Sequence, residues 1–131
     1  MKLLLDTHIW LWAVTDPGSL APRVRAALSE PDAEIWLSPV SIWEVLLLAQ
    51  RGRIQFTTDP HAWVRDRLAG GPYREAALTW DVAMESRALA LDHEDPADRF
   101  LAATARVYGL TLVTADARLI RASGFPVLAN L

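Results

Sequence analysis

The stretch Lys2-Leu3-Leu4-Leu5-Asp6 places a carboxylate directly after a short apolar run. The arrangement recurs at Leu112-Val113-Thr114, which Asp116 follows at a distance of two residues. Apolar runs of about four residues are typical of strands buried on both faces of a parallel sheet. Ligands of such sheets bind beyond the carboxyl ends of the strands. We therefore expect Asp6 and Asp116 to lie at a ligand-binding edge of a sheet.

Two further acids stand where helices are expected to begin. Glu44 follows Ser41 by three residues, which is the spacing of a helix capping box. Asp98 falls in the first turn of a helix that Asp95-Pro96 would open. Carboxylates gathered in a medium of low dielectric repel one another unless a cation holds them. Ligation by oxygen alone suits Mg²⁺ or Mn²⁺.

Strand and helix patterns alternate along the whole chain, which predicts a parallel sheet flanked by helices. We expect an α/β fold, a three-layer α/β/α sandwich with a four- or five-stranded parallel sheet, in a single domain over residues 1–131. Strands are expected near residues 2–5, 34–38, 74–78, 111–114 and 127, and helices near 22–29, 41–51, 60–70, 79–91, 97–108 and 116–122. Residues 7–14 are expected to form an aromatic-rich turn or short helix.

Composition limits the possible classes of function. The chain has no cysteine, which excludes disulfides, thiolate zinc sites and cysteine nucleophiles. It shows no signal peptide and no membrane-spanning run, so we expect a soluble cytoplasmic protein. Its histidines, His8, His61 and His93, match no zinc-site spacing. No P-loop, Gly-x-Gly-x-x-Gly or Gly-x-Ser-x-Gly motif occurs.

Charge and aromatic content bear on partners. A net charge of −3 argues against a protein devoted to sequence-independent nucleic-acid binding. Arginines at positions 51, 53, 65 and 67 could still form a basic rim that contacts phosphate, or could reflect a high-GC genome that uses arginine for lysine. Six tryptophans and an all-round apolar helical segment, residues 45–49, favour a surface covered by a partner. A Trp-rich core would also explain the tryptophans.

Each acid also has a purely structural explanation. Glu44 could complete a capping box with Ser41. Asp116 could cap the last helix, and Asp98 could interact with the dipole of its own helix. Asp6 is the hardest to explain in this way, because an unpaired charge at the end of a buried strand is costly unless it caps the next segment. The argument for chemistry therefore depends on the expected common location of the four acids.

Four motifs, taken in order, resemble those of the PIN-domain family. They are Leu4-Leu5-Asp6-Thr7-His8-Ile9-Trp10-Leu11-Trp12, Ser38-Pro39-Val40-Ser41-Ile42-Trp43-Glu44, Asp95-Pro96-Ala97-Asp98-Arg99-Phe100-Leu101-Ala102-Ala103-Thr104-Ala105 and Leu112-Val113-Thr114-Ala115-Asp116. Their order, their spacing and the length of the chain are similar to those of VapC-type toxins of prokaryotic type II toxin–antitoxin systems. One departure is Thr7, where many relatives carry asparagine, and Thr-His is a familiar variant.

The resemblance implies an endoribonuclease that depends on Mg²⁺ or Mn²⁺. Its acidic pocket, which would hold the metal, would consist of Asp6, Glu44, Asp98 and Asp116. Asp6 and Asp98 are our first choice for direct ligands of the metal, and Glu44 and Asp116 would ligate it directly or through water. Thr114 would orient the acids, Ser41 is a similar candidate, and Asp95 is an additional acid near the site. The resemblance also implies an RNA substrate, a small antitoxin lying across a hydrophobic groove, and a homodimer.

Other classes of protein fit these residues less well. A non-catalytic PIN-like binding module, acting through a protein partner, would not need all four carboxylates. A receiver domain needs a lysine beside its aspartate, and Lys2 is the only lysine. A phosphatase of the haloacid-dehalogenase type would carry Asp-x-Asp where this chain has Asp6-Thr7-His8. A structure-specific DNA nuclease would share the fold and the metal chemistry, and RNA is favoured over DNA by the resemblance alone.

Overall fold

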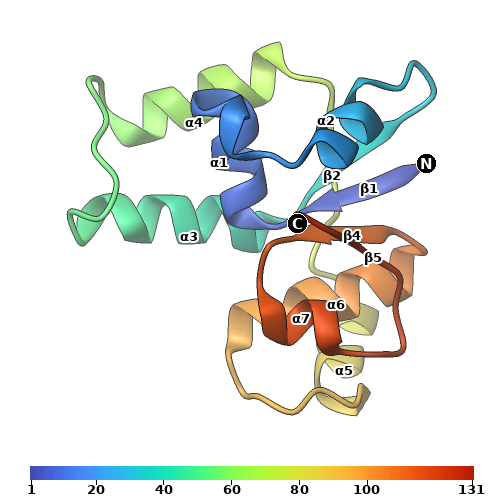
Figure 1. Ribbon diagram of the computed structural model, residues 1–131. Coiled ribbons are helices and arrows are strands. Elements are labelled where there is room, and N and C mark those ends of the chain that lie inside the picture. Colours follow the sequence, from blue (N-terminus) through green and yellow to red (C-terminus); the bar gives the residue numbers. More distant parts are fainter.

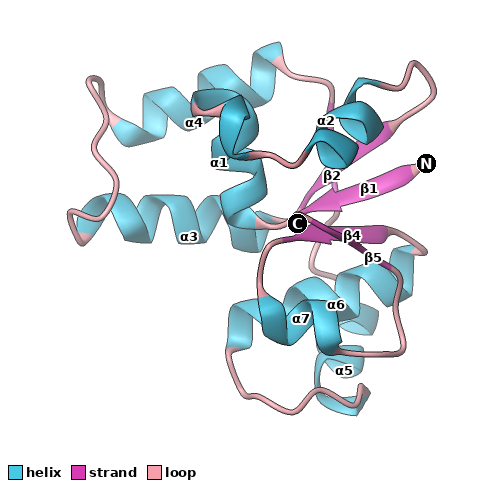
Figure 2. Cartoon of the chain, in the orientation of Figure 1, coloured by secondary structure: helices cyan, strands magenta, loops and turns pink.

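Five parallel strands form the sheet at the centre of the molecule (Figure 2). The computed structural model describes all 131 residues, Met1–Leu131. The strands are β1 (Lys2–Leu5), β2 (Glu34–Leu37), β3 (Tyr73–Glu75), β4 (Thr111–Thr114) and β5 (Val127–Ala129). They lie in the order β3-β2-β1-β4-β5. The predicted α/β fold is confirmed, with the sheet in its five-stranded form.

Helices cover both faces of the sheet and complete the three layers (Figure 1). One side carries α1 (Thr7–Thr15), α2 (Pro22–Ser29), α3 (Pro39–Gln50) and α4 (Pro60–Gly70), with a short 3-10 helix at Pro17–Ser19. The other side carries α5 (Trp80–Ala88), α6 (Pro96–Tyr108) and α7 (Ala117–Arg121), and α5 packs against α6. None of these helices combines the length and the apolar character needed to cross a lipid bilayer.

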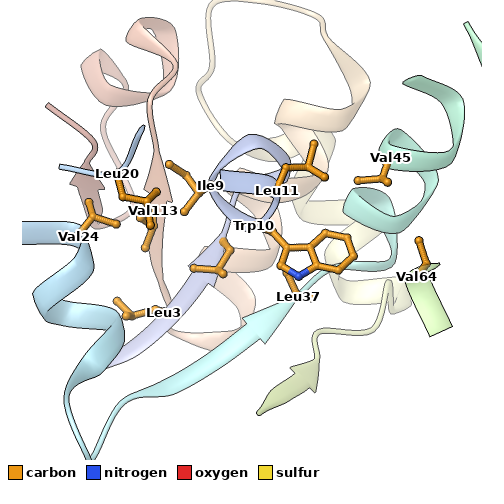
Figure 3. Close-up of a cluster of buried hydrophobic side chains, with 11 residues drawn as sticks. Leu3, Ile9, Trp10, Leu11, Leu20, Val24, Leu37, Val45, Val64 and Val113 are labelled. Carbon is orange, nitrogen blue, oxygen red and sulfur yellow. The ribbon is translucent and has the colours of Figure 1, made fainter. Parts of the chain in front are cut away.

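The alternation of side chains along β1 divides the core in two. Successive residues of a strand point to opposite faces. Leu3 and Leu5 accordingly join the larger cluster under α1–α4, which contains the fully buried Trp10 (Figure 3). Leu4 joins Leu101 of α6 in the cluster on the opposite face. All three leucines are buried, which explains why β1 is a continuous apolar run and not an alternating one.

Helix α3 begins earlier than the sequence analysis predicts. Its first residue is Pro39, and its N-cap is Ser38, whose Oγ accepts a hydrogen bond from Val40 N at 3.0 Å. Proline is favoured at the first helical position because the N–H that it lacks would have no partner there. The predicted capping box of Ser41 and Glu44 is therefore wrong, and both residues lie inside the helix.

Other element boundaries differ by a few residues. Residues 7–14, expected as a turn or short helix, belong to the helix α1 of nine residues. The strand predicted over 34–38 ends at Leu37, because Ser38 caps α3. The strand predicted over 74–78 is β3 at the edge of the sheet, where pairing with β2 extends only over Tyr73–Glu75.

The strand order reverses at β1, which has β2 on one side and β4 on the other. In open α/β sheets such a switch point is where ligands bind, outside the carboxyl ends of the strands. Helices α1, α3 and α7 follow directly after β1, β2 and β4, so their N-terminal ends gather at this edge (Figure 1). The fold thus places residues that follow β1 and β4 at one location.

Candidate active site at the carboxyl edge of the sheet

Asp6 and Thr114 connect the ends of β1 and β4. Asp6 is the N-cap of α1, and its Oδ1 accepts a hydrogen bond from Thr7 N at 2.7 Å. Its Oδ2 accepts a hydrogen bond from Thr114 Oγ1 at 2.6 Å. The Thr114 oxygen in turn accepts a hydrogen bond from Asp116 N at 3.0 Å. One buried hydroxyl therefore fixes the Asp6 carboxylate and the turn that carries Asp116.

Glu44 reaches the same edge from the second turn of α3. Thr7 Oγ1 donates a hydrogen bond to Glu44 Oε1 and lies 3.1 Å from Ser41 Oγ. Ser41 is three residues before Glu44, so the two side chains share one face of the helix. Both Thr7 and Ser41 are buried. Thr7 thus links the first turn of α1 to α3 directly beside Asp6.

Asp98 enters the site from the first turn of α6. Asp95 caps this helix, and its Oδ1 accepts a hydrogen bond from Asp98 N at 3.1 Å. The Asp98 residue is only 8% exposed, and its Oδ2 lies 3.2 Å from Arg118 Nη2. His93 Nδ1 is 3.8 Å from the same oxygen, which is beyond hydrogen-bond distance. Arg118 is therefore the main partner of the Asp98 carboxylate.

Arg118 bridges Asp98 and Asp116. Asp116 caps α7, and its Oδ1 accepts a hydrogen bond from Arg118 N at 2.8 Å. Nη2 of Arg118 lies 3.2 Å from Asp98 Oδ2 and also 3.2 Å from Asp116 Oδ2. The guanidinium therefore supplies a positive charge between two carboxylates that come from different helices.

Burial raises the pKa of the Asp6 and Glu44 carboxyls. For Asp6 the hydrogen bonds from Thr114 and Thr7 oppose the effect of burial but do not cancel it. For Glu44 the hydrogen bond from Thr7 opposes burial, while the negative charge of Asp6 adds to the rise. Both carboxyls therefore hold their protons more tightly than free carboxyls do, and both would gain from a nearby cation.

Asp98 and Asp116 titrate differently although they share Arg118. Burial raises the pKa of Asp98 to about 7, and the negative charges of Asp95, Asp6 and Asp116 add to the rise, while Arg118 opposes it. Burial acts on Asp116 in the same direction, but hydrogen bonds from the Arg118 side chain and backbone outweigh it and lower the pKa of Asp116. The mutual effects of these charges show that the predicted acids lie within electrostatic range of one another.

Arg99 is a buried arginine without a carboxylate partner. Its guanidinium donates hydrogen bonds to four backbone carbonyl oxygens: those of Ser86 at 2.8 Å, Leu91 at 2.9 Å, Leu89 at 3.1 Å and His93 at 3.2 Å. These carbonyls belong to the end of α5 and to the segment that leads into α6. Arg99 therefore fixes the approach of the chain to Asp95 and Asp98.

The donor set suits a hard divalent cation, because carboxylate oxygens are the ligands that Mg²⁺ and Mn²⁺ prefer. Burial, and for all three the charge of neighbouring acids, raises the pKa of Asp6, Glu44 and Asp98, so a cation placed among them would favour their ionised forms. In the present arrangement no three His, Asp or Glu side chains lie close enough to hold one ion. A cation shared by Asp98 and Asp116 therefore requires the guanidinium of Arg118 to move.

The structure brings Asp6, Glu44, Asp98 and Asp116 to one edge of the sheet, and Thr114 and Ser41 lie among them. Three residues to which the sequence analysis gave no role in the site also contribute. Thr7 follows Asp6 directly, and Arg118 follows Asp116 by two residues, so proximity to an acid is the sequence signal for both. The sequence indicates the role of Arg99 less clearly, because its only sign is an arginine among the apolar residues of one helical face.

Comparison with known proteins identifies relatives in sequence. Residues 3–124 of the chain match the PIN domain family. Ribonuclease VapC22 of Mycobacterium tuberculosis is 33% identical over 118 residues, which cover 89% of this chain and 88% of that protein.

Solved structures share the fold at lower sequence identity. A toxin–antitoxin complex from Klebsiella pneumoniae matches with a TM-score of 0.69 at 22% identity and covers 98% of each chain. The DNA-bound VapBC from Salmonella typhimurium matches with a TM-score of 0.70 at 17% identity and covers 100% of this chain and 99% of that one. At these identities the likeness concerns the fold alone.

Proposed function

The chain belongs to the PIN domain family, and on that basis we propose that it is a metal-dependent endoribonuclease, the toxin of a type II toxin–antitoxin system. The observation that carries the proposal is the set of four carboxylates at the switch point of the sheet, Asp6, Glu44, Asp98 and Asp116. A sequence identity of 33% to a ribonuclease, over most of both chains, supports RNA as the substrate.

Asp6 and Asp98 would hold Mg²⁺ or Mn²⁺ directly, and Glu44 and Asp116 would ligate it directly or through water. Such an ion, when bound, supplies a water molecule of lowered pKa and neutralises charge on the phosphate during phosphodiester hydrolysis. Burial and neighbouring acids raise the pKa of Asp98 to about 7 in the metal-free protein, so a cation would compete with protons for this carboxylate near neutral pH.

The uncharged polar residues of the site hold the acids in position. Thr114 donates a hydrogen bond to Oδ2 of Asp6, and Thr7 donates one to Oε1 of Glu44. Ser41 Oγ lies 3.1 Å from the same Thr7 hydroxyl. These hydrogen bonds lower the pKa of the acids, so they favour the ionised forms that bind a cation.

Cleavage of labelled RNA by the purified protein, free of antitoxin, tests this function. Wild type, Asp6→Asn and a control, Asp32→Asn, are compared in Mg²⁺, in Mn²⁺ and in EDTA. Asp32 is an exposed residue in the turn before β2, so its replacement removes one negative charge far from the site. We expect wild type and Asp32→Asn to cut RNA only with metal, and Asp6→Asn to be inactive while it remains folded.

Other outcomes point to other functions. Full activity of a folded Asp6→Asn protein would remove the acidic site from the mechanism. A folded wild type that binds Mn²⁺ but cuts neither RNA nor DNA would be a binding module. Metal-dependent cleavage of DNA but not of RNA would identify a DNA nuclease of the same fold.

The protein partner proposed for this chain is a small antitoxin. The docking site proposed for it is a cavity of about 430 Å³ between α1 and the segment that joins α3 to α4. Trp12, Phe56 and Trp63 line this cavity, with His8 and Arg53 at its polar side. Aromatic side chains of this kind are enriched in the cores of protein interfaces. A Trp12→Ser variant should therefore lose co-purification with the antitoxin and keep its ribonuclease activity.

The interface proposed for a homodimer is an apolar patch at the start of α5. Trp80 is 89% exposed, Met84 is 64% exposed and Leu78 is 42% exposed. Contiguous exposed apolar side chains are uncommon on monomers and mark interaction surfaces. A Trp80→Glu variant should run as a monomer in size-exclusion chromatography with light scattering, whereas wild type runs as a dimer.

A further inference from the structure

A second cavity adjoins the acids on the side of α7. Its volume is about 440 Å³, which lies within the usual range for small-ligand sites. Residues 90–93 form one wall, and α7 with the turn after it forms the other. Arg118 and Arg121 are three residues apart on one face of α7 and both line the cavity, together with Ser123. Asp92 is the one acid in its lining. We call this site the α7 cavity.

Both walls of the α7 cavity are held in place by the fold. Arg99 donates hydrogen bonds to the carbonyl oxygens of Leu91 and His93 and so fixes the first wall. Buried Leu119 anchors α7 to the core, and Asp116 caps it. The segment between α5 and α6 and the helix α7 lie on the same side of the sheet (Figure 1). A preformed cavity of this kind needs little ordering when a ligand binds.

The cavity offers hydrogen-bond donors that have no partner within the protein. Arg121 forms neither an ion pair nor a hydrogen bond, and its side chain is exposed. Arg118 uses Nη2 for its two carboxylate partners, which leaves Nη1 free. The Ser123 hydroxyl also has no partner. Guanidinium groups bind phosphate oxygens through pairs of parallel N–H donors.

We propose that the α7 cavity binds the phosphate of the RNA strand next to the scissile one. The proposal rests on the ribonuclease function proposed above and names the part of the substrate that this cavity holds. Arg118 contacts Asp98 and Asp116 and also lines the cavity, so the cavity is directly adjacent to these two carboxylates. A strand whose scissile phosphate lies at the carboxylates therefore passes its next phosphate over Arg118 and Arg121.

The lining favours phosphate over a nucleobase. The cavity contains no Phe, Tyr or Trp on which a base could stack. Its charges are the two arginines against Asp92 alone. A cation bound by Asp98 and Asp116 would take up their negative charge, so the charge of Arg118 would then add to that of Arg121. The electrostatic attraction for phosphate is therefore greatest when the site is ready for hydrolysis.

RNA binding by Arg121 variants tests the proposal. A fluorescein-labelled single-stranded RNA oligonucleotide is titrated in Mg²⁺, by fluorescence anisotropy, into proteins that also carry Asp6→Asn, so that the strand is not cut. The added changes are Arg121→Gln, Arg121→Lys and the control Arg25→Gln on α2, which removes one positive charge away from the site. Because Arg121 has no partner in the protein, its replacement should leave the melting temperature unchanged.

We expect Arg121→Gln to raise the Kd about tenfold, whereas Arg25→Gln leaves it within about twofold. The slope of log K against log salt should become shallower by about 0.7, the value for one phosphate contact with a single strand. Arg121→Lys should keep the salt slope and recover part of the affinity, because it keeps the charge and loses the paired donors.

Equal Kd values and equal slopes for Arg121→Gln and Arg25→Gln would overturn the subsite but leave the ribonuclease function intact, provided that wild type cuts RNA. Failure of wild type to bind and cut RNA would overturn both. A third result, in which Arg121→Gln weakens binding of a protein partner and not of RNA, would assign the cavity to a protein interface and overturn the proposal.

Discussion

Thr114 Oγ1 donates a hydrogen bond of 2.6 Å to Asp6 Oδ2 and so joins two residues that are 108 positions apart in the sequence. The two residues lie at the ends of neighbouring strands, because β4 pairs with β1 in parallel. Thr114 is fully buried and also accepts the Asp116 N–H. The hydroxyl therefore sets the relative positions of two acids of the proposed active site.

Replacing Thr114 by valine should destabilise the protein. The change keeps the shape of the side chain but leaves Asp6 Oδ2 and the Asp116 N–H without their hydrogen-bond partner, while Asp6 Oδ1 keeps its bond from Thr7 N. We expect the free energy of unfolding, measured with urea, to fall by about 1–3 kcal/mol. The pKa of Asp6 should rise further, because the Thr114 bond normally lowers it. Thr114→Ser keeps the hydroxyl and serves as the control, so equal losses for Val and Ser would contradict this role.

The metal-free protein should lose stability as the pH rises from 5 towards 8. The pKa of Asp98 is about 7 in the folded protein and 3.8 as an ordinary carboxyl, so the folded state binds more protons in this window. Stability then falls with rising pH, and the contribution of Asp98 is fully lost above about pH 7. Melting temperatures in EDTA should show this trend, which Asp98→Asn should weaken. An unchanged trend in Asp98→Asn would assign it to other groups.

Removing the Arg118 side chain charge should strengthen metal binding. In Arg118→Met the carboxylates of Asp98 and Asp116 lose the guanidinium that lies between them, so a divalent cation no longer competes with it. We expect about tenfold tighter Mn²⁺ binding by calorimetry, which corresponds to about 1.4 kcal/mol. In EDTA the same variant should melt at a lower temperature than wild type, because the two acids then repel each other. Weaker Mn²⁺ binding than in the control Arg25→Met would argue that Arg118 does not compete with the metal.

Arg99→Lys should be strongly destabilising although it conserves the charge. A lysine ammonium group cannot reproduce the planar fork that reaches four carbonyl oxygens, and a buried cation would lose partners. We expect a loss of about 2–5 kcal/mol in urea unfolding. Arg87→Lys, at an exposed ion pair with Glu94, is the matched control and should leave the stability nearly unchanged. Similar behaviour of the two variants would show that Arg99 does not hold the α5–α6 segment.

The sequence predicted the parallel sheet well because its signals are local. The leucines of β1 are apolar in succession, and only a strand covered on both faces needs that pattern. Asp95 before Pro96 and Asp116 before its helix acted as N-caps, as their residue types favour. The error at α3 has a local cause too, because two serines, Ser38 and Ser41, compete as caps and Pro39 decides between them.

By itself the sequence determined that acids follow β1 and β4 and that Asp6, Asp95 and Asp116 cap the helices that come after them. These features depend on residues within a few positions of one another in the sequence. Their contacts can form without the packing of distant segments. Only the tertiary structure decided that Thr114 meets Asp6, that Thr7 meets Glu44 across 37 positions and that Arg118 reaches Asp98. Such pairs require the order β3-β2-β1-β4-β5, which is fixed by the packing of helices on both faces and not by any single segment.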